Sequence, residues 1–123
     1  MKITIITATY NSAATLSDTM ESVLRQTHHD IEHIIVDGCS TDGTLSIARS
    51  MEPRYGGRLR IISEPDKGLY DAMNKGLRMA TGDVVGLLNS DDFYTDDHAL
   101  ERSARAFADN EVDAVYGDVH YVH

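Results

Sequence analysis

Apolar residues follow two alternating patterns along the chain. Short runs of adjacent β-branched and aliphatic residues, such as Ile3 to Ile6, are typical of buried strands. Between these runs, apolar residues recur every three or four positions, as they do in amphipathic helices. The runs predict strands at 2–7, 34–36, 59–63, 83–88 and 114–116, and the helical spacing predicts helices around 16–24, 45–51, 69–80 and 96–109.

The order of these elements predicts the fold class. Strands and helices alternate throughout, and the helices are long enough to cross from one parallel strand to the next, so we expect one α/β domain with a mainly parallel sheet. Gly82 is expected to cap the carboxyl end of the helix with the clearest apolar stripe. That stripe comprises Leu69, Ala72, Met73, Gly76, Leu77 and Ala80.

Composition and charge exclude several functions. The 123 residues include 11 Lys+Arg and 20 Asp+Glu, a formal net charge of -9 at pH 7. A chain this acidic is a poor candidate for binding duplex nucleic acid or an anionic lipid surface. The single Cys39 cannot form an internal disulfide, and no apolar stretch is long enough for a signal peptide or a membrane span. We therefore expect a cytosolic domain without a nucleic-acid partner.

Polar residues gather where the predicted strands end. Ligands of open α/β sheets bind outside the carboxyl ends of the strands, so these four segments are the expected site. The six histidines show no metal-ligand spacing and are interpreted as solvated, and no base is identified that would make Cys39 a nucleophile. The four polar segments are 7–11, 37–40, 64–68 and 89–92.

The segment Asn89-Ser90-Asp91-Asp92 gives the most specific indication of function. Two adjacent carboxylates on a tight turn offer hard oxygen ligands but do not complete the coordination shell of a metal ion. Mg²⁺ or Mn²⁺ is held in this way when substrate phosphates supply the other ligands. A solvated acidic turn that caps the next helix is an equally good interpretation of these four residues alone.

Four further polar positions are candidates for contact with a ligand. Asp37 could accept hydrogen bonds from a ribose hydroxyl or a base N–H, or it could cap a turn shared with Ser40. Lys67 offers a point charge to a diphosphate, or is a solvated surface lysine. Asp71 could form a surface ion pair with Lys75, four residues on, but Asp71 and Asn74 lie in the first turns of their predicted helix, close to the strand-end edge, which favours ligand contact.

Taken together, five segments in this order resemble the family 2 glycosyltransferases. They are 7–11 (TATYN), 36–44 (VDGCSTDGT), 66–76 (DKGLYDAMNKG), 80–83 (ATGD) and 88–92 (LNSDD). The resemblance covers essentially the whole chain. It implies the GT-A fold, a three-layer, Rossmann-like domain with helices on both faces of the sheet. It also implies transfer of a sugar from a nucleotide-diphosphate donor, UDP favoured, usually with inversion and with Mg²⁺ or Mn²⁺.

The resemblance also implies roles for individual residues. Asp91 is the expected metal ligand and catalytic residue, with Asp92 as a second ligand. Asn89 stands where the family's Asp-any-Asp motif has its first acid, so it brings a hydrogen-bonding group without a charge. The residues expected to bind the donor are Thr7, Ala8, Thr9, Tyr10, Asn11, Asp37, Lys67, Asp71, Asn74, Asn89 and Ser90.

The family places its catalytic base well beyond the metal motif, in a second half that builds the acceptor site. By resemblance, residues 1–123 are therefore the donor-binding part of a longer enzyme, and no residue among them is named as the base. The implied acceptor is a saccharide or lipid-linked saccharide. The implied setting is surface polysaccharide synthesis at the cytoplasmic face of a membrane, with peripheral membrane association through other residues.

Two other functions are weighed against a transferase. A nucleotide-binding module without catalysis would use the same strand-end residues. A receiver-type signalling domain has this length and acidity, but it needs an acidic pair after the first strand, whereas this acidic pair follows the fourth.

Overall fold

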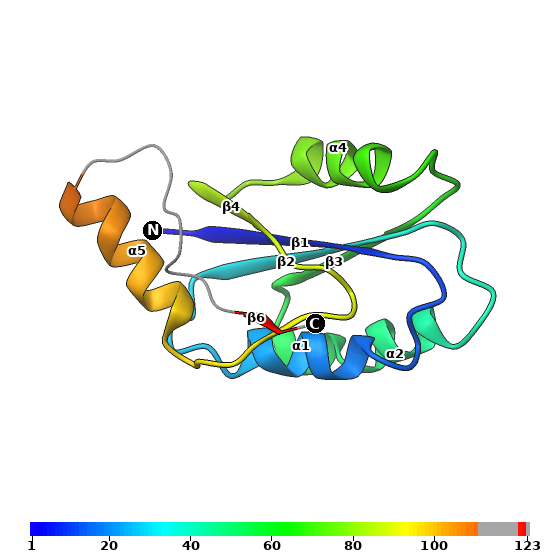
Figure 1. Ribbon diagram of the computed structural model, residues 1–123, viewed down its shortest axis with the longest axis horizontal. Helices are drawn as coiled ribbons and strands as arrows, with labels where there is room; N and C mark the ends of the chain where they lie inside the picture. Colours follow the sequence, from blue (N-terminus) through cyan, green and yellow to red (C-terminus); the bar gives the residue numbers. More distant parts are fainter. Residues whose placement is uncertain (111–120, 123) are drawn as a thin grey trace.

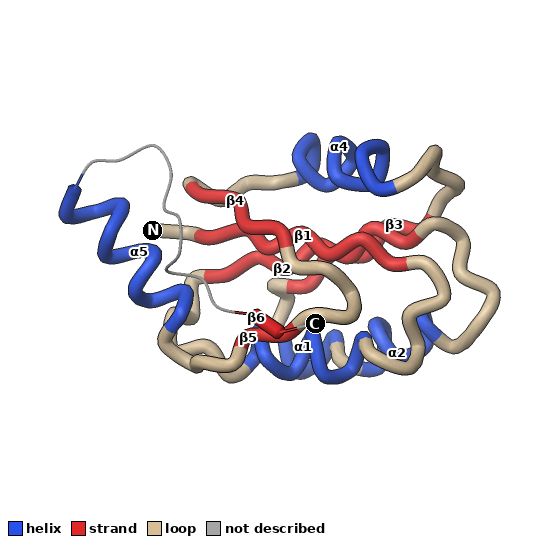
Figure 2. Tube along the Cα trace, viewed as in Figure 1, coloured by secondary structure: helices blue, strands red, loops and turns tan. Residues whose placement is uncertain are grey.

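The computed structural model describes residues 1–110 and 121–122. A four-stranded parallel sheet, in the order β3-β2-β1-β4, lies between α4 on one face and α1 and α2 on the other (Figure 1). This three-layer α/β arrangement confirms the predicted fold class. A short antiparallel pair, β5 with β6, lies beside α1 (Figure 2). The strands are β1 Ile3–Thr9, β2 Ile31–Asp37, β3 Leu59–Ser63, β4 Val84–Leu87, β5 Phe93–Tyr94 and β6 Tyr121–Val122. The helices are α1 Leu16–Leu24, α2 Thr44–Ser50, α3 Glu52–Tyr55, α4 Leu69–Met79 and α5 Ala99–Asn110.

The parallel register brings the strand ends together at one edge. Thr9 of β1 pairs with Asp37 of β2, which in turn pairs with Ser63 of β3. On the other side of β1, Ile6 pairs with Leu87, the last residue of β4. The loops that follow these strands therefore leave the sheet on the same side.

Alternation along the strands divides the core into two layers. Ile5 and Ile35 pack with Leu16 and Met20 of α1, whereas Ile6 packs toward α4. Apolar side chains of β1 and β2 are therefore buried on both faces of the sheet, as expected for central parallel strands.

The helix α4 contacts the sheet through its small residues. Ala72 and Gly76 are its buried residues, and a Cβ on Gly76 would lie 2.6 Å from Ile6 Cγ2. The predicted stripe was wrong at Leu69 and Leu77, which are 54% and 47% exposed. Because small residues make the contact, the larger ones at the margins of the stripe lie outside it.

Several predicted boundaries change. The third strand matches its predicted range, but α4 ends at Met79 and Ala80 is extended, so Gly82 does not cap it. Gly82 instead packs on β1, where a Cβ would lie 2.6 Å from Thr4 Oγ1. The helix α3 and the strand β5 were not predicted, and the predicted strand 114–116 lies outside the described residues.

The interpretation of all six histidines as solvated was wrong for His33. Its ring is fully buried in β2, with Nε2 2.8 Å from Thr7 Oγ1 and Nδ1 2.8 Å from Tyr55 Oη. Burial disfavours the charged imidazolium and lowers the pKa of His33 to about 3. The imidazole is therefore a neutral member of the core.

A polar cluster, which we call the amino-end cluster, lies at the start of β2 around the buried carboxylate of Glu32. Thr4 Oγ1 donates to it at 2.9 Å, and Thr81 donates from its backbone N–H at 2.9 Å and its hydroxyl at 3.0 Å. Two cations complete the cluster, with Arg60 Nη1 at 3.3 Å and Lys2 Nζ at 4.0 Å. Burial acts to raise the pKa of Glu32, but the hydrogen bonds outweigh it and the pKa is lowered.

No helix in the described part of the chain is both long and apolar enough to cross a membrane.

Candidate functional site

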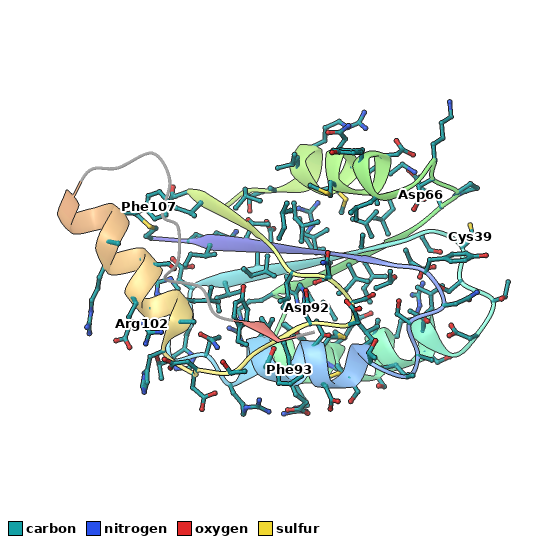
Figure 3. The ribbon with its side chains drawn as sticks, in the orientation of Figure 1. Cys39, Asp66, Asp92, Phe93, Arg102 and Phe107 are labelled. Atoms are coloured by element: carbon teal, nitrogen blue, oxygen red, sulfur yellow. The ribbon has the colours of Figure 1, made fainter. Side chains whose placement is uncertain are left out.

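A cleft of about 370 Å³ opens at the edge where the strands end. Figure 3 shows Asp66 and Cys39 at this same end of the molecule. Of the residues expected to bind a donor, Ala8, Thr9, Tyr10 and Ser90 line the cleft. The other lining residues are Ser12, Asp66, Gly68, Leu69 and Ala72. Ser12 and Asp66 were missed, although Asp66 belongs to the polar segment 64–68 and Ser12 directly follows the segment 7–11.

Asn11 fastens the loop after β1 to the loop after β2. Its backbone N–H donates to Ser40 Oγ at 2.8 Å, and its Oδ1 accepts the backbone N–H of Thr41 at 2.8 Å. Asn11 has a left-handed φ of 49°, a conformation that Asn tolerates better than most residues. In the second loop, Asp42 accepts the Ala13 N–H at 3.2 Å. Two of the loops beside the cleft are thus held as one unit.

Asp37 is buried at the point where three strands end. Its Oδ1 accepts from the hydroxyls of Thr9 at 2.7 Å and Ser40 at 2.5 Å. Its Oδ2 accepts from the Ser40 N–H at 2.8 Å and the Ser63 hydroxyl at 3.0 Å. Burial acts to raise the pKa of Asp37, but these hydrogen bonds prevail and hold it below its ordinary value. The contacts are those of the predicted turn cap, and direct contact with a ribose or base stays a prediction.

Thr7 does not border the cleft as predicted. Its side chain is fully buried and is hydrogen-bonded to His33. Alternation along β1 explains the difference, because Ala8 lies on the opposite face of the strand from Thr7 and Thr9. Thr9 shares the face of Thr7 but reaches the cleft because it lies at the strand end.

The acidic turn places its two carboxylates in different environments. Asp91 is exposed and makes no hydrogen bond or ion pair with any residue in the described part of the chain, whereas Asp92 is fully buried. Figure 3 shows Asp92 on the α1 side of the sheet. Ser90 is fixed by Ser12, whose hydroxyl donates to Ser90 Oγ at 2.9 Å. Asn89 is exposed, and its carbonyl accepts the Asp92 N–H at 3.1 Å, which closes the turn.

The predicted donor-side residues in and just before α4, which are Lys67, Asp71 and Asn74, are not among the residues that line the cleft. Asp71 Oδ2 accepts the backbone N–H of Lys67 at 3.0 Å and lies 3.4 Å from Lys75 Nζ. The Lys67 hydrogen bond, followed by the Lys75 contacts, lowers the pKa of Asp71. Lys67 itself is exposed, beside Gly68 of the cleft. Asn74 does not line the cleft and instead borders a separate depression of about 440 Å³ with Leu77 and Arg78.

Acids outnumber cations where the strands end. Within residues 1–110 and 121–122, no side-chain cation forms an ion pair with Asp37, Asp66 or Asp91. Asp66 lies against the end of β2, where a Cβ on Gly38 would be 2.7 Å from Asp66 Oδ2. The glycine therefore makes room for this carboxylate. The described part of the chain contains no group of three His, Cys, Asp or Glu side chains that could hold a metal ion.

Known proteins resemble this chain in sequence and in fold. The sequence profile described as "Glycosyl transferase family 2" matches residues 4–122. A "PGL/p-HBAD biosynthesis glycosyltransferase" of Mycobacterium tuberculosis is 45% identical over 116 residues, which is 94% of this chain. The chain spans 45% of the length of that relative.

Two solved structures share the fold. Residues 1–349 of TarS from S. aureus, in complex with UDP-GlcNAc, superpose with a TM-score of 0.85 at 27% identity, covering 92% of this chain and 33% of that one. The mannosyltransferase PcManGT from Pyrobaculum calidifontis, in complex with GDP-Man and Mn²⁺, has a TM-score of 0.81 at 29% identity. It is matched over 90% of this chain and 33% of its own.

Proposed function

The chain belongs to glycosyl transferase family 2, and we propose that residues 1–123 form the donor-binding part of a glycosyltransferase. The proposed reaction transfers a hexosyl or N-acetylhexosaminyl group, with inversion, from a nucleotide-diphosphate sugar to a saccharide or lipid-linked saccharide. The structures of TarS with UDP-GlcNAc and of PcManGT with GDP-Man support a nucleotide-sugar donor.

The observation that carries this proposal is the uncompensated acidity beside the cleft. A nucleoside diphosphate is an anion and would be repelled by Asp37, Asp66 and Asp91 unless a cation lay between them. The exposed carboxylate of Asp91 fits one ligand position of Mg²⁺ or Mn²⁺, because both metals accept carboxylate oxygens and complete their coordination with phosphates. When bound, such a cation would neutralise the charge that develops on the departing nucleoside diphosphate. The Mn²⁺ in the PcManGT complex supports the use of a divalent cation.

The residues of the chain divide into binding and positioning roles. Ala8, Thr9 and Tyr10 would border the nucleotide, and the exposed Lys67 would supply a positive charge to the diphosphate. Asp37 would act indirectly, because its hydrogen bonds hold together the strand ends that carry these residues. Asp91 is the favoured metal ligand, because the carboxylate of Asp92 is buried.

The donor and the setting are narrower proposals. A UDP-sugar is favoured by the TarS complex, and the GDP-Man complex of PcManGT makes GDP the competitor to test. A role in biosynthesis is supported by the name of the mycobacterial relative, and the cytoplasmic face of a membrane is the setting that we propose from the resemblance in sequence.

The two other functions make different predictions. In a receiver domain the acidic pair would follow the first strand, but here β1 ends at Thr9 and the acidic turn follows β4. A non-catalytic nucleotide-binding module would bind the nucleotide and leave the donor sugar intact when an acceptor is present.

Calorimetry with UDP, GDP and dTDP, each with and without Mn²⁺, tests the proposal. We expect one nucleoside diphosphate to bind more tightly with the metal, and Asp91→Ala to lose that dependence. Ser17→Ala, an exposed position on α1, is the matched control. Failure of all three nucleotides to bind the wild-type chain would refute the proposal.

A further inference from the structure

The helix α1 carries a second stripe beside its apolar one. Leu16 and Met20 of the apolar stripe pack into the sheet. Thr15, Thr19 and Gln26 are spaced by four and seven residues, which places them along one side of a helix and its end. Thr19 and Gln26 are each 1% exposed and Thr15 is half-buried, so most of this polar stripe is covered.

The polar stripe is covered by the acidic turn and the segment that follows it. Thr15 Oγ1 donates to the Ser90 carbonyl at 2.7 Å. Thr19 Oγ1 lies 2.6 Å from the Asp92 carbonyl and 2.9 Å from the Ser90 carbonyl. Two hydroxyls one helical turn apart thus hold the backbone on either side of Asp91.

Gln26 holds the far end of the same segment. Its Nε2 donates to the Asp96 carbonyl at 2.9 Å, and its Oε1 accepts the Leu100 N–H at 3.0 Å. The second bond satisfies an N–H in the first turn of α5, which has no partner within its own helix. The polar stripe therefore fixes the chain from Ser90 to the start of α5.

These contacts have a chemical consequence for the turn. A backbone carbonyl has two lone pairs, and the Ser90 carbonyl lies within hydrogen-bonding distance of two hydroxyls, those of Thr15 and Thr19. The Asp92 carbonyl receives the Thr19 hydroxyl. The backbone oxygens of Ser90 and Asp92, on either side of Asp91, thus contact hydroxyls of Thr15 and Thr19, whereas Asp91 itself is exposed.

We propose that Thr15, Thr19 and Gln26 are positioning residues that hold the Asn89–Asp92 turn in register with the cleft. Their role is to place Ser90 in the cleft wall and to leave Asp91 beside it. The positioning rests on the contacts above, and only its effect on metal binding rests on the proposed function.

Hydrogen–deuterium exchange measures the positioning directly, without a ligand. In Thr19→Val, which keeps the shape but removes the hydroxyl, we expect faster exchange in the peptide spanning residues 89–93. Thr19→Ser should restore the wild-type rate. Ser22→Ala is the matched control, because within the described part of the chain the buried Ser22 hydroxyl makes its hydrogen bond inside α1, to the Thr19 carbonyl. Equal exchange of this peptide in Thr19→Val and Ser22→Ala would overturn the proposal.

Mn²⁺-dependent UDP binding measures the consequence. Removing groups that orient a metal ligand typically weakens metal affinity by about tenfold or more, so we expect a loss of that size in Thr19→Val, rescue in Thr19→Ser and no loss in Ser22→Ala. Binding of UDP without metal should not change. Wild-type Mn²⁺ dependence in a folded Thr19→Val protein would contradict the proposal.

If Thr19→Val does not fold, Thr15→Val is judged by the same two measurements. If the wild-type chain shows no Mn²⁺ dependence, the proposed function fails and the exchange data alone decide the positioning role.

Discussion

The strand β2 carries a buried carboxylate at each end, and the two differ in how their charge is balanced. Glu32 at the amino end and Asp37 at the carboxyl end each accept hydrogen bonds from hydroxyls and a backbone N–H, and each has a lowered pKa. Glu32 also has Arg60 and Lys2 within 4.0 Å. In the described part of the chain, Asp37 has no ion-pair partner.

This difference in charge balance distinguishes a cluster with a structural role, at the amino end of β2, from a candidate binding site at its carboxyl end. The amino-end cluster contains its own cations, and it joins the sheet to the loop after α4 through Thr81. The carboxyl end has the same hydrogen-bonding chemistry and a cleft, but three of its acids, Asp37, Asp66 and Asp91, have no ion-pair partner in the described part of the chain. We therefore propose that a bound ligand supplies the positive charge at the carboxyl end.

Lowering the pH should produce the largest change in the free energy of unfolding, because His33 of β2 is buried in its neutral form. Its pKa is about 3 when folded and 6.5 when exposed, so below pH 6.5 the unfolded chain takes up a proton that the folded chain does not. Stability should therefore be full above pH 6.5 and fall by about 1.4 kcal/mol per pH unit as the pH drops toward 3.

Urea unfolding between pH 7 and pH 5 measures this slope above the range in which carboxylates titrate. In His33→Gln the slope should be flatter, whatever the variant's stability at pH 7. An equal slope in the two proteins would mean that His33 is not held neutral.

Removing the carboxyl-end acid should have the next largest effect. Asp37→Ala leaves the Thr9 hydroxyl and the Ser40 N–H without their acceptor, and we expect a loss of about 3 kcal/mol in the free energy of unfolding. Asp91→Ala, which removes an exposed acid, should stay within about 0.5 kcal/mol of wild type. Similar losses in the two variants would erase the distinction between the positioning acid and the ligand acid.

Removing a cation from the amino-end cluster should cost less. In Arg60→Met the aliphatic bulk is kept and the ion pair to Glu32 is lost, and since the Arg60 side chain is 41% exposed we expect a loss of only about 0.5 kcal/mol. The loss should shrink in high salt, because screening already weakens the pair. A larger, salt-independent loss would show that Arg60 acts through its hydrogen bond to the Met79 carbonyl.

The sequence predicted the architecture because hydrophobic periodicity records which faces are buried. The third strand was predicted at its observed bounds, and the alternation of elements indicated a parallel sheet whose loops share one edge. The predicted cleft residues Thr9, Tyr10 and Ser90 do line one cleft. Position after a parallel strand is enough to bring such residues together.

The burial of polar residues could not be predicted from the sequence. Glu32, His33 and Thr19 have polar side chains, but tertiary contacts bury each of them, and no local sequence pattern distinguishes them from solvated residues. The four residues of α3 are too few to show a helical period. Thr7 was misplaced because proximity to a strand end does not fix which face a side chain occupies.

Electron paramagnetic resonance of free Mn²⁺ shows directly whether a cation binds together with the nucleotide at the carboxyl edge. In a titration of the chain with Mn²⁺ in the presence of excess UDP, corrected for Mn²⁺ bound by UDP alone, we expect one protein-bound Mn²⁺ per chain. We also expect Asp91→Asn, which keeps the size of the side chain, to lose this binding. Tight binding of UDP by the wild-type chain with no Mn²⁺ taken up would refute the proposed role of the cation, because the acids at the carboxyl edge would then admit the diphosphate without one.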